Sequence, residues 1–330
     1  MRHLKALFLA MIATALPAAG QLYQLHDSGA IWRFTGVACS GGSCPGWQLL
    51  DNNPNTREIV AAGGQLYQRH ANGMIWRYTG TPCSGASCPG WQLLDNNPNT
   101  STIVAGGTQL YQKHVDGKIW RYTGTPCSGA SCPGWQLLDN NTRTVALTAG
   151  GARLYQKHVD GKIWRYAGTP CSGASCPGWQ LIDNNTRTVS ITASAGDLYQ
   201  RHNNGAIWRY TGTPCSGASC PGWTLFDNNP ATTAIAAGGP LLYQLHGATG
   251  LIWRYTGTPC SASGCPGWQR LDNNPHTRQI VSGIGGGLYQ RHDTGAIWRY
   301  TGIPCSGDSC GGWAQLDNNA HTRTIVFSGD

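Results

Sequence analysis

The chain is built almost entirely from one unit that recurs seven times. The unit LYQRHANGMIWRYTGTPCSGASCPGWQLLDNNPNTSTIVAGG returns with few changes, and its first Cys recurs at intervals of 44 residues four times and 45 residues twice. All 14 Trp and all 14 Cys belong to the repeat, so residues 21–330 leave no sequence over for a second kind of domain. A fixed period of this length indicates a repeat architecture. The units start near Leu22, Leu66, Leu110, Leu154, Leu198, Leu242 and Leu288.

Each unit carries four short runs rich in β-forming residues, separated by turn signals. In the second unit the strands are expected at 66–70, 74–79, 91–97 and 102–107, joined by an Asn-Gly turn, a Gly/Ser/Pro-rich loop and an Asn-Pro turn. Four strands in about 40–50 residues is the period of a propeller blade. A β-solenoid would need shorter repeats, and separate small beads would struggle to bury their aromatic surface. The sequence therefore predicts an all-β, seven-bladed β-propeller with four antiparallel strands per blade.

Side-chain size predicts the order of strands within a blade. Strands next to the axis are crowded, which favours the small and β-branched run TIVAGG as the innermost strand, with the next three strands of the chain lying progressively outward. The chain would then begin on a second strand near Leu22 and end on an innermost strand at 324–327. The N- and C-terminal strands are therefore predicted to share one blade.

Residues 1–20 have the pattern of a signal peptide. Three basic residues within positions 2–5 precede the apolar run 6–16, and small residues follow at 18–20. The apolar run is too short to span a bilayer. The alternative is a buried N-terminal helix or strand. We expect a secreted, extracellular protein whose mature chain begins near Gly20 or Gln21.

Charge limits the classes of partner. Only 12% of the residues are charged, and the formal net charge of +8 is spread along the chain. No run of Lys and Arg resembles a nucleic-acid-binding patch. No segment after residue 20 is long and apolar enough for a transmembrane helix. We therefore expect neither a nucleic-acid partner nor a transmembrane segment.

Every unit carries two Cys in the spacing C-x4-C, which together with a signal peptide indicates disulfides within loops. Each would close a small loop and stabilise the fold by about 2 kcal/mol in the chain-entropy model. Zinc binding is the alternative, but it would need two further ligands, and the repeated His lies 13 residues upstream on another strand. We expect no metal site and no cofactor. The predicted disulfides are Cys39–Cys44, Cys83–Cys88, Cys127–Cys132, Cys171–Cys176, Cys215–Cys220, Cys260–Cys265 and Cys305–Cys310.

A His and an Asp also recur in each unit, which raises the question of catalysis. A catalytic His–Asp pair needs a nucleophile or a second carboxylate nearby, and the Ser residues of the Cys loops are better explained as turn formers. The chain has 15 acidic residues, and seven of them are this one Asp beside an Asn pair, which favours a turn-capping role. We therefore interpret His, Trp and Asp as a buried hydrogen-bond network, with metal binding and catalysis as the alternatives, and we do not expect an enzyme.

The first Trp of each unit and the Arg that follows it are the candidate ligand-binding residues. Part of the aromatic set is needed to fill space between blades, but rings exposed at grooves can stack on a sugar while Arg and amide groups bond its hydroxyls. Strand alternation turns the Arg to the opposite face from its Trp, so a site would combine the Arg of one blade with aromatics of the next. The candidates are Trp32, Arg33, Trp76, Arg77, Trp120, Arg121, Trp164, Arg165, Trp208, Arg209, Trp253, Arg254, Trp298 and Arg299.

The strings LYQRHANGMIWRYTG, GWQLLDNN and TIVAGG resemble the repeat of tectonin-type and Photorhabdus-type β-propeller lectins. The resemblance covers the mature chain at the level of the repeat pattern. It implies a seven-bladed fold with sugar sites between blades and fucose-like or O-methylated sugars as ligands. The CSGxSC loop departs from that pattern.

These observations favour a secreted multivalent carbohydrate-binding protein whose glycan partners bind at or between blades. The alternative is a structural, self-associating extracellular repeat protein, since low charge and abundant Gly, Asn and Gln also suit contacts between copies. Sequons at Asn99, Asn140 and Asn184 are N-glycosylation acceptors if the host is a eukaryote.

Overall fold

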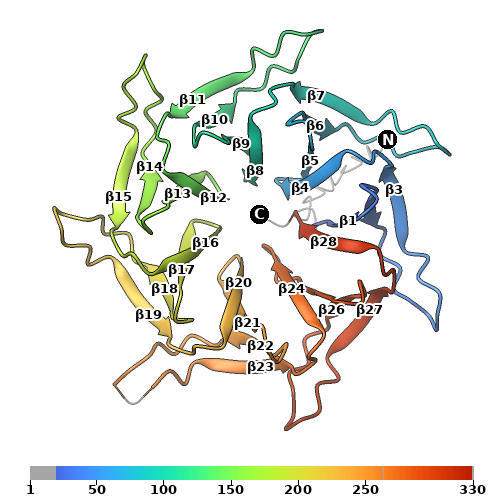
Figure 1. The fold of residues 1–330 in the computed structure, drawn as a ribbon. Helices are drawn as coiled ribbons and strands as arrows, with labels where there is room; N and C mark the ends of the chain where they lie inside the picture. Colours follow the sequence, from blue (N-terminus) through green and yellow to red (C-terminus); the bar gives the residue numbers. More distant parts are fainter. Residues whose placement is uncertain (1–19, 263, 329–330) are drawn as a thin grey trace, which may run out of the picture.

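The computed structural model describes residues 20–262 and 264–328, so the predicted signal peptide lies outside the described residues except for Gly20. Seven four-stranded antiparallel sheets surround a central axis like the blades of a propeller (Figure 1). This confirms the predicted fold class. We number the blades from 1 to 7 in the order in which their outer strands follow along the chain.

The strand bounds repeat closely from blade to blade. Blade 1 contains β28 (Thr322–Phe327), β1 (Leu22–His26), β2 (Ile31–Phe34) and β3 (Trp47–Asp51), and blade 2 contains β4 (Thr56–Ala62), β5 (Gln65–His70), β6 (Ile75–Tyr78) and β7 (Trp91–Asp95). Blade 3 contains β8 (Thr100–Gly106), β9 (Gln109–His114), β10 (Ile119–Tyr122) and β11 (Trp135–Asp139), and blade 4 contains β12 (Thr144–Gly150), β13 (Arg153–His158), β14 (Ile163–Tyr166) and β15 (Trp179–Asp183). Blade 5 contains β16 (Thr188–Ser194), β17 (Asp197–His202), β18 (Ile207–Tyr210) and β19 (Trp223–Asp227). Blade 6 contains β20 (Thr232–Gly238), β21 (Leu241–His246), β22 (Ile252–Tyr255) and β23 (Trp268–Asp272), and blade 7 contains β24 (Thr277–Ser282), β25 (Leu288–His292), β26 (Ile297–Tyr300) and β27 (Trp313–Asp317).

The innermost strands are those that the sequence predicted. β4, β8, β12, β16, β20, β24 and β28 contact one another in a ring around the axis. Crowding explains their small residues: a Cβ added at Gly106 would lie 2.8 Å from the Cβ of Ala149 in the next blade. The inner strand is longer than predicted, because β8 begins at Thr100, whose side chain is buried between blades.

The hydrophobic core is divided among the blade interfaces rather than gathered at one centre. Tyr23, Leu25 and Ile31 of blade 1 pack with Ile59 and Leu66 of blade 2, and equivalent clusters occur around the ring. Each interface therefore depends on side chains from two blades, which makes the ring the cooperative unit.

Ring closure follows the predicted route. β28 pairs with β1 in blade 1, with Leu22 opposite Phe327 and Gln24 opposite Ile325. Beyond the strands, Gln21 N donates to Ser328 Oγ over 2.9 Å, and Ser328 N donates to the Gln21 carbonyl oxygen over 2.9 Å. The first and last described parts of the chain are thus held together by backbone pairing.

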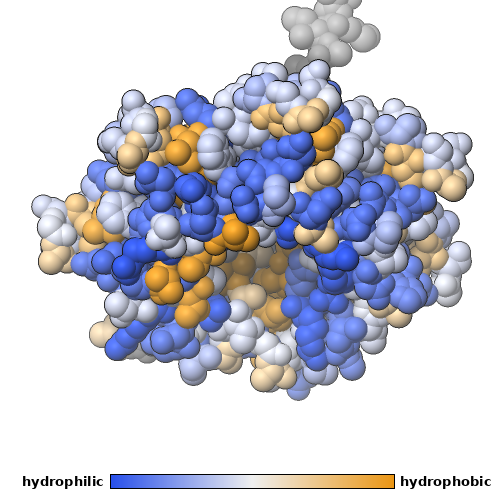
Figure 2. All heavy atoms as spheres, turned by 45° about the horizontal axis from the view of Figure 1, so that its top comes forward, coloured by the Kyte–Doolittle hydropathy of each residue, from blue (hydrophilic) through white to orange (hydrophobic). Residues whose placement is uncertain are grey.

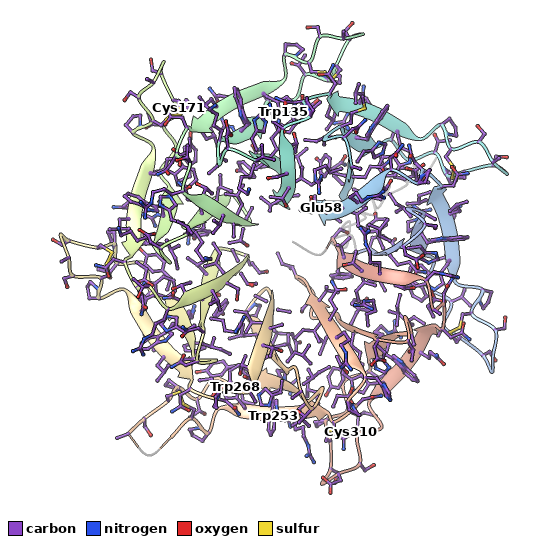
Figure 3. The ribbon with its side chains drawn as sticks, in the orientation of Figure 1. Glu58, Trp135, Cys171, Trp253, Trp268 and Cys310 are labelled. Atoms are coloured by element: carbon purple, nitrogen blue, oxygen red, sulfur yellow. A yellow bond between two sulfur atoms is a disulfide. The ribbon has the colours of Figure 1, made fainter. Side chains whose placement is uncertain are left out.

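All seven predicted disulfides are present, each within a loop on the outer circumference of the ring, as the labelled Cys171 and Cys310 illustrate (Figure 3). The loop of blade 2 lies along the outer strand of blade 1: Cys83 N donates to the Leu49 carbonyl oxygen over 3.2 Å, and Asn52 Nδ2 donates to the Ala86 carbonyl oxygen over 3.2 Å. These loops therefore cover the open edge of the preceding blade, a device that protects a sheet from edge-to-edge association. In the described part of the chain, no helix has the length and apolar character needed to cross a membrane.

Candidate binding sites between blades

Alternation along the strands assigns the predicted Trp and Arg to different interfaces. The face of blade 1 that carries Tyr23 and Ile31 packs on blade 2, and the face that carries Leu22 and Phe34 packs on blade 7. Arg33 shares the parity of Ile31, and Trp32 the opposite parity. Arg33 therefore faces blade 2 and Trp32 faces blade 7, so the two members of each predicted pair contribute to separate sites.

The second Trp of each unit connects neighbouring blades. Trp91 Nε1 donates to the Leu50 carbonyl oxygen of the preceding blade over 2.9 Å, and its ring packs on Tyr78 with 5.3 Å between centroids. The equivalent bond occurs at all seven interfaces. This Trp serves packing, as the sequence analysis expected for part of the aromatic set.

The first Trp lies against the repeated His. The rings of His70 and Trp76 have their centroids 5.8 Å apart, and similar pairs recur in the other six blades. The indole nitrogen of this Trp is buried and has no hydrogen-bond partner among the described residues in any blade. Between blades 4 and 5, His202 and Trp208 line a cavity of about 510 Å³ together with Asp183. Burial lowers the pKa of the His residues and keeps the imidazoles neutral.

The buried network between blades differs from the predicted His–Trp–Asp set. Gln68 Nε2 donates to Asp51 Oδ2 of the preceding blade over 2.7 Å, and Thr56 Oγ1 donates to Gln68 Oε1 over 2.6 Å. His70 reaches the network only through Gln68, with 3.2 Å between its Nε2 and the amide oxygen. The Asp also caps its turn as predicted, since Asn52 N donates to Asp51 Oδ1. Gln–Asp bonds occur between Gln24 and Asp317, Gln68 and Asp51, Gln112 and Asp95, Gln156 and Asp139, Gln200 and Asp183, and Gln290 and Asp272.

Burial raises the pKa of the repeated Asp carboxyl in six units, because desolvation outweighs the hydrogen bonds that the carboxyl accepts; the six are Asp51, Asp95, Asp139, Asp183, Asp227 and Asp272. The Gln that completes the network was missed in the sequence analysis. The sequence signal for this Gln is the YQ pair at the centre of the second strand of each blade, because an amide at a buried position requires a hydrogen-bond partner.

A second kind of cavity lies at the other end of the interface and contains the predicted Arg. Between blades 1 and 2, a groove of about 400 Å³ is lined by Tyr23, Arg33 and the segments 64–66 and 77–80. The Arg33 guanidinium donates through one NH2 group to Gln48 Oε1 over 2.5 Å. We call this cavity an Arg groove. Equivalent grooves of about 650 Å³ and 890 Å³ lie between blades 2 and 3 and between blades 3 and 4.

The Arg groove does combine an Arg with an aromatic of the next blade, but that aromatic is the Tyr of IWRY rather than the Trp. Arg33 and Tyr78 line the same groove, and the hydroxyl of Tyr78 is buried without a partner among the described residues. Burial raises the pKa of Tyr78, and the nearby Arg33 charge works in the opposite direction. The groove thus holds a fixed guanidinium, an aromatic ring and an unused hydroxyl.

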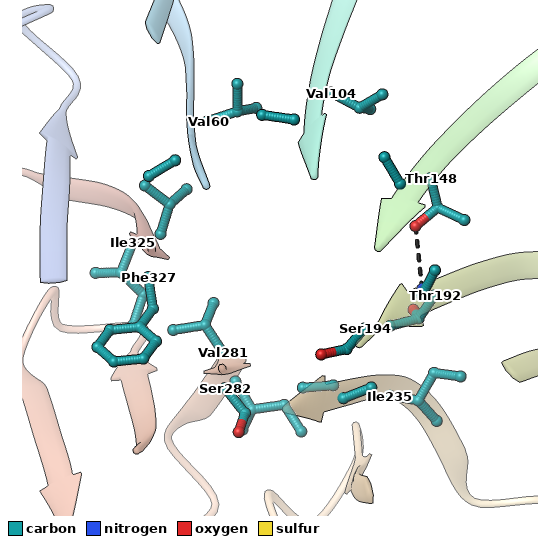
Figure 4. A pocket seen from close by; sticks show the side chains of 18 of the residues that line it. Val60, Val104, Thr148, Thr192, Ser194, Ile235, Val281, Ser282, Ile325 and Phe327 are labelled. Atoms are coloured by element: carbon teal, nitrogen blue, oxygen red, sulfur yellow. Dashed lines mark hydrogen bonds between the residues drawn. The ribbon is translucent and has the colours of Figure 1, made fainter. Parts of the chain in front are cut away.

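The central channel is lined by few polar side chains. Its cavity of about 370 Å³ is lined mainly by small and apolar side chains of the innermost strands, among them Val60, Val104 and Phe327 (Figure 4). Thr148 Oγ1 accepts a hydrogen bond from Ala193 N over 3.1 Å, which occupies one of its few polar groups. Figure 2 shows apolar residues within the central opening and hydrophilic residues over much of the surrounding surface.

The sequons differ in their surroundings. Asn140 Nδ2 and Asn184 Nδ2 donate to the carbonyl oxygens of Ala174 and Ala218 in the following Cys loops, each over 2.9 Å. The amide nitrogens that a glycan would occupy therefore connect two blades. Asn99 is exposed at a turn.

No protein-family model and no curated protein matches the sequence. Solved structures are similar in fold: Prp20p from Saccharomyces cerevisiae superposes with a TM-score of 0.58 at 9% identity, covering 92% of this chain and 88% of that one. Human WBSCR16 gives 0.51 at 10% identity over 92% and 94% of the two chains. A catalytically inactive virginiamycin B lyase from Staphylococcus aureus, solved with quinupristin, gives 0.50 at 16% identity over 84% and 93%. At these identities the likeness extends to the propeller fold alone.

Proposed function

We propose that this protein is a secreted lectin that binds glycans in the Arg grooves between its blades. The observation that carries the proposal is a guanidinium held by a Gln amide beside a buried Tyr hydroxyl that has no partner among the described residues. Leaving a polar group buried and unpaired costs about 1–3 kcal/mol, so a groove of this kind favours a ligand rich in hydroxyl groups.

The groove has the chemistry that sugar recognition requires. Arg33 keeps further N–H donors after its bond to Gln48, and Tyr78 adds a hydroxyl that can donate or accept. The ring of Tyr78 can pack on the apolar face of a sugar. The volumes of the three grooves lie within the roughly 300–1,000 Å³ of small-molecule sites.

The ring arrangement supports multivalent binding. The three grooves include the turn between the two innermost strands of a blade, which places them on one side of the propeller. Sites that face the same way can engage a glycan-coated surface together, and linking them on one body raises avidity well above the affinity of a single site. The disulfide in every blade supports a location outside the cytosol.

We propose binding without catalysis. The buried Asp is bonded to Gln rather than to His, so the two titratable groups of the repeat do not form an acid–base pair. The Arg and its Gln partner recur in five of the seven interfaces, which suits repeated binding better than one specialised centre.

A glycan array probed with the purified protein tests the proposal, with fucose-like and O-methylated sugars included as the ligands that the lectin resemblance implies. Combined Arg33→Ala and Arg77→Ala changes should weaken binding while circular dichroism and the melting temperature remain close to those of the parent protein. The proposal would be overturned by absence of binding to every glycan together with concentration-dependent filaments or sheets, which would favour the structural alternative.

A further inference from the structure

The seven grooves between blades differ in the residues around their Arg, although all seven blades are four-stranded sheets of the same topology. In five of them the Arg is half-buried and donates to a Gln Oε1 over 2.5–2.6 Å. In the same five grooves the Arg faces a Tyr whose hydroxyl is buried and has no partner among the described residues. The five pairs are Arg33 with Tyr78, Arg77 with Tyr122, Arg121 with Tyr166, Arg165 with Tyr210, and Arg254 with Tyr300.

The groove between blades 7 and 1 has lost both partners of its Arg. Ala314 stands where five other blades have Gln beside the Arg, and Phe34 stands where the other six blades have the Tyr. Arg299 is accordingly exposed rather than half-buried.

The groove between blades 5 and 6 is altered in another way. Thr224 replaces the Gln, and Arg209 instead donates to Asp197 Oδ1, over 2.8 Å from its NH2 group and 3.2 Å from its Nε. Phe226 stacks on Tyr255 with 4.3 Å between ring centroids. A carboxylate of the chain itself thus accepts from the NH2 group, which donates to Gln in the intact grooves, and from the Nε group.

Three of the intact grooves carry positive charge that no carboxylate among their described lining residues balances. Arg33 and Arg77 line the first of these grooves, Arg77 and Arg121 the second, and Arg121, Arg153 and Arg165 the third. A Gln amide orients a guanidinium but leaves its charge in place. Half-burial of paired like charges favours an anionic ligand, because an Arg fork binds a planar oxyanion through two N–H groups.

We infer that the five Arg–Gln–Tyr grooves bind an oxyanion, the carboxylate or the sulfate ester of an acidic glycan, whereas the grooves that contain Arg209 and Arg299 do not. The inference rests on the proposed function and narrows its ligand class. Asp197 supplies the internal precedent, since its carboxylate engages the Arg of its groove through the same NH2 and Nε donors.

Isothermal titration of the purified protein with trigalacturonate, with a sulfated galactose trisaccharide and with neutral galactotriose tests the inference. We expect up to five sites per chain for an acidic ligand, and an affinity that falls roughly tenfold between low salt and 0.5 M NaCl because charge attraction is screened. A preference for trigalacturonate identifies the carboxylate, and a preference for the sulfated sugar identifies the sulfate ester. Equal binding of galactotriose that still depends on Arg33 would overturn the anionic ligand and leave the lectin proposal standing.

Double variants test whether five of the grooves bind the ligand and the other two do not. Arg33→Gln with Arg77→Gln should remove two sites. Arg57→Gln with Arg278→Gln, at exposed positions at the starts of β4 and β24 and away from the turns that line the grooves, should leave the number of sites unchanged. Phe34→Tyr with Ala314→Gln should add a site by rebuilding the groove between blades 7 and 1. Seven equal sites in the parent protein would overturn the selection, and a loss of sites in the Arg57/Arg278 variant would overturn the assignment of binding to the Arg grooves. Absence of binding by acidic and neutral glycans alike would overturn the lectin proposal itself.

Discussion

Trp91 of blade 2 donates its indole N–H to the carbonyl oxygen of Leu50 in blade 1, over 2.9 Å. Fifteen residues upstream, Trp76 presents an indole N–H that is buried and has no partner among the described residues. The two Trp of this blade therefore differ in whether the indole N–H, which a Trp→Phe change removes, donates a hydrogen bond. This difference makes them a matched pair for mutation.

Trp91→Phe should destabilise the protein more than Trp76→Phe does. Both changes delete similar ring volume, but only the first leaves a buried carbonyl oxygen without its donor, at a cost of about 1–3 kcal/mol. Urea unfolding followed by circular dichroism measures the difference. Equal losses in the two variants would show that the bond between Trp91 and Leu50 adds nothing to the blade interface.

Gln68→Leu should cost about 2–4 kcal/mol of unfolding free energy, because it leaves the Asp51 carboxylate and the Thr56 hydroxyl buried without their partner. The same change at Gln92, which is half-buried and bonded only to the Arg77 side chain among the described contacts, should cost under about 1 kcal/mol. Chemical denaturation compares the two. A similar loss at both positions would argue against the inter-blade network as a source of stability.

Acid should destabilise the fold between pH 6.5 and about 4. Burial lowers the pKa of His292 to about 4, so in this window the unfolded chain binds a proton that the folded chain does not, and stability falls as the pH falls. Each such His contributes a slope of up to about 1.4 kcal/mol per pH unit. The raised pKa of the buried Asp carboxyls acts in the opposite sense at lower pH, because protonation there favours the folded state.

Unfolding free energies at pH 7.0, 5.5 and 4.5 test this dependence. In His292→Gln the slope of unfolding free energy against pH between pH 6.5 and 4 should be smaller by the contribution of up to one bound proton. An unchanged slope in His292→Gln would contradict the assignment.

Deletion of the residues after His321 should destabilise the whole ring. It removes β28, the innermost strand of blade 1, together with its pairing to β1 and the side chain of Ile325 from the core between blades 7 and 1. A single cooperative unfolding transition at markedly lower temperature is expected by calorimetry. Thermal unfolding like that of the intact protein would count against closure of the ring by this strand.

The repeat made the fold predictable because each strand and turn pattern occurs seven times in the sequence. Period, turn residues and side-chain size gave the blades, their strand order, the closure and the local disulfides. Contacts between blades were harder, because they depend on how two twisted sheets meet. Gln68 and Asp51 lie 17 residues apart and in different blades, so no spacing in the sequence relates them.

The candidate site was predictable only in outline. Alternation correctly separated Arg33 from Trp32, but it did not say that Arg33 lies at the end of the interface that holds Tyr78 rather than Trp76. The unequal grooves did have a signal in the sequence: Phe34, Thr224 and Ala314 interrupt otherwise constant positions of the repeat. Their meaning depends on the structure, which shows that the Phe and the Ala fall on one interface.

The pairing of β28 with β1 fixes an order of events as well as a shape. Blade 1 supplies the first strands to be synthesised, yet its innermost strand is the last, so blade 1 stays three-stranded until the ribosome has passed Thr322. The first blade to be started is thus the last to be finished. Until then blade 1 lacks the strand that completes its sheet and its core with blade 7, so the blades form an open arc and not a closed ring.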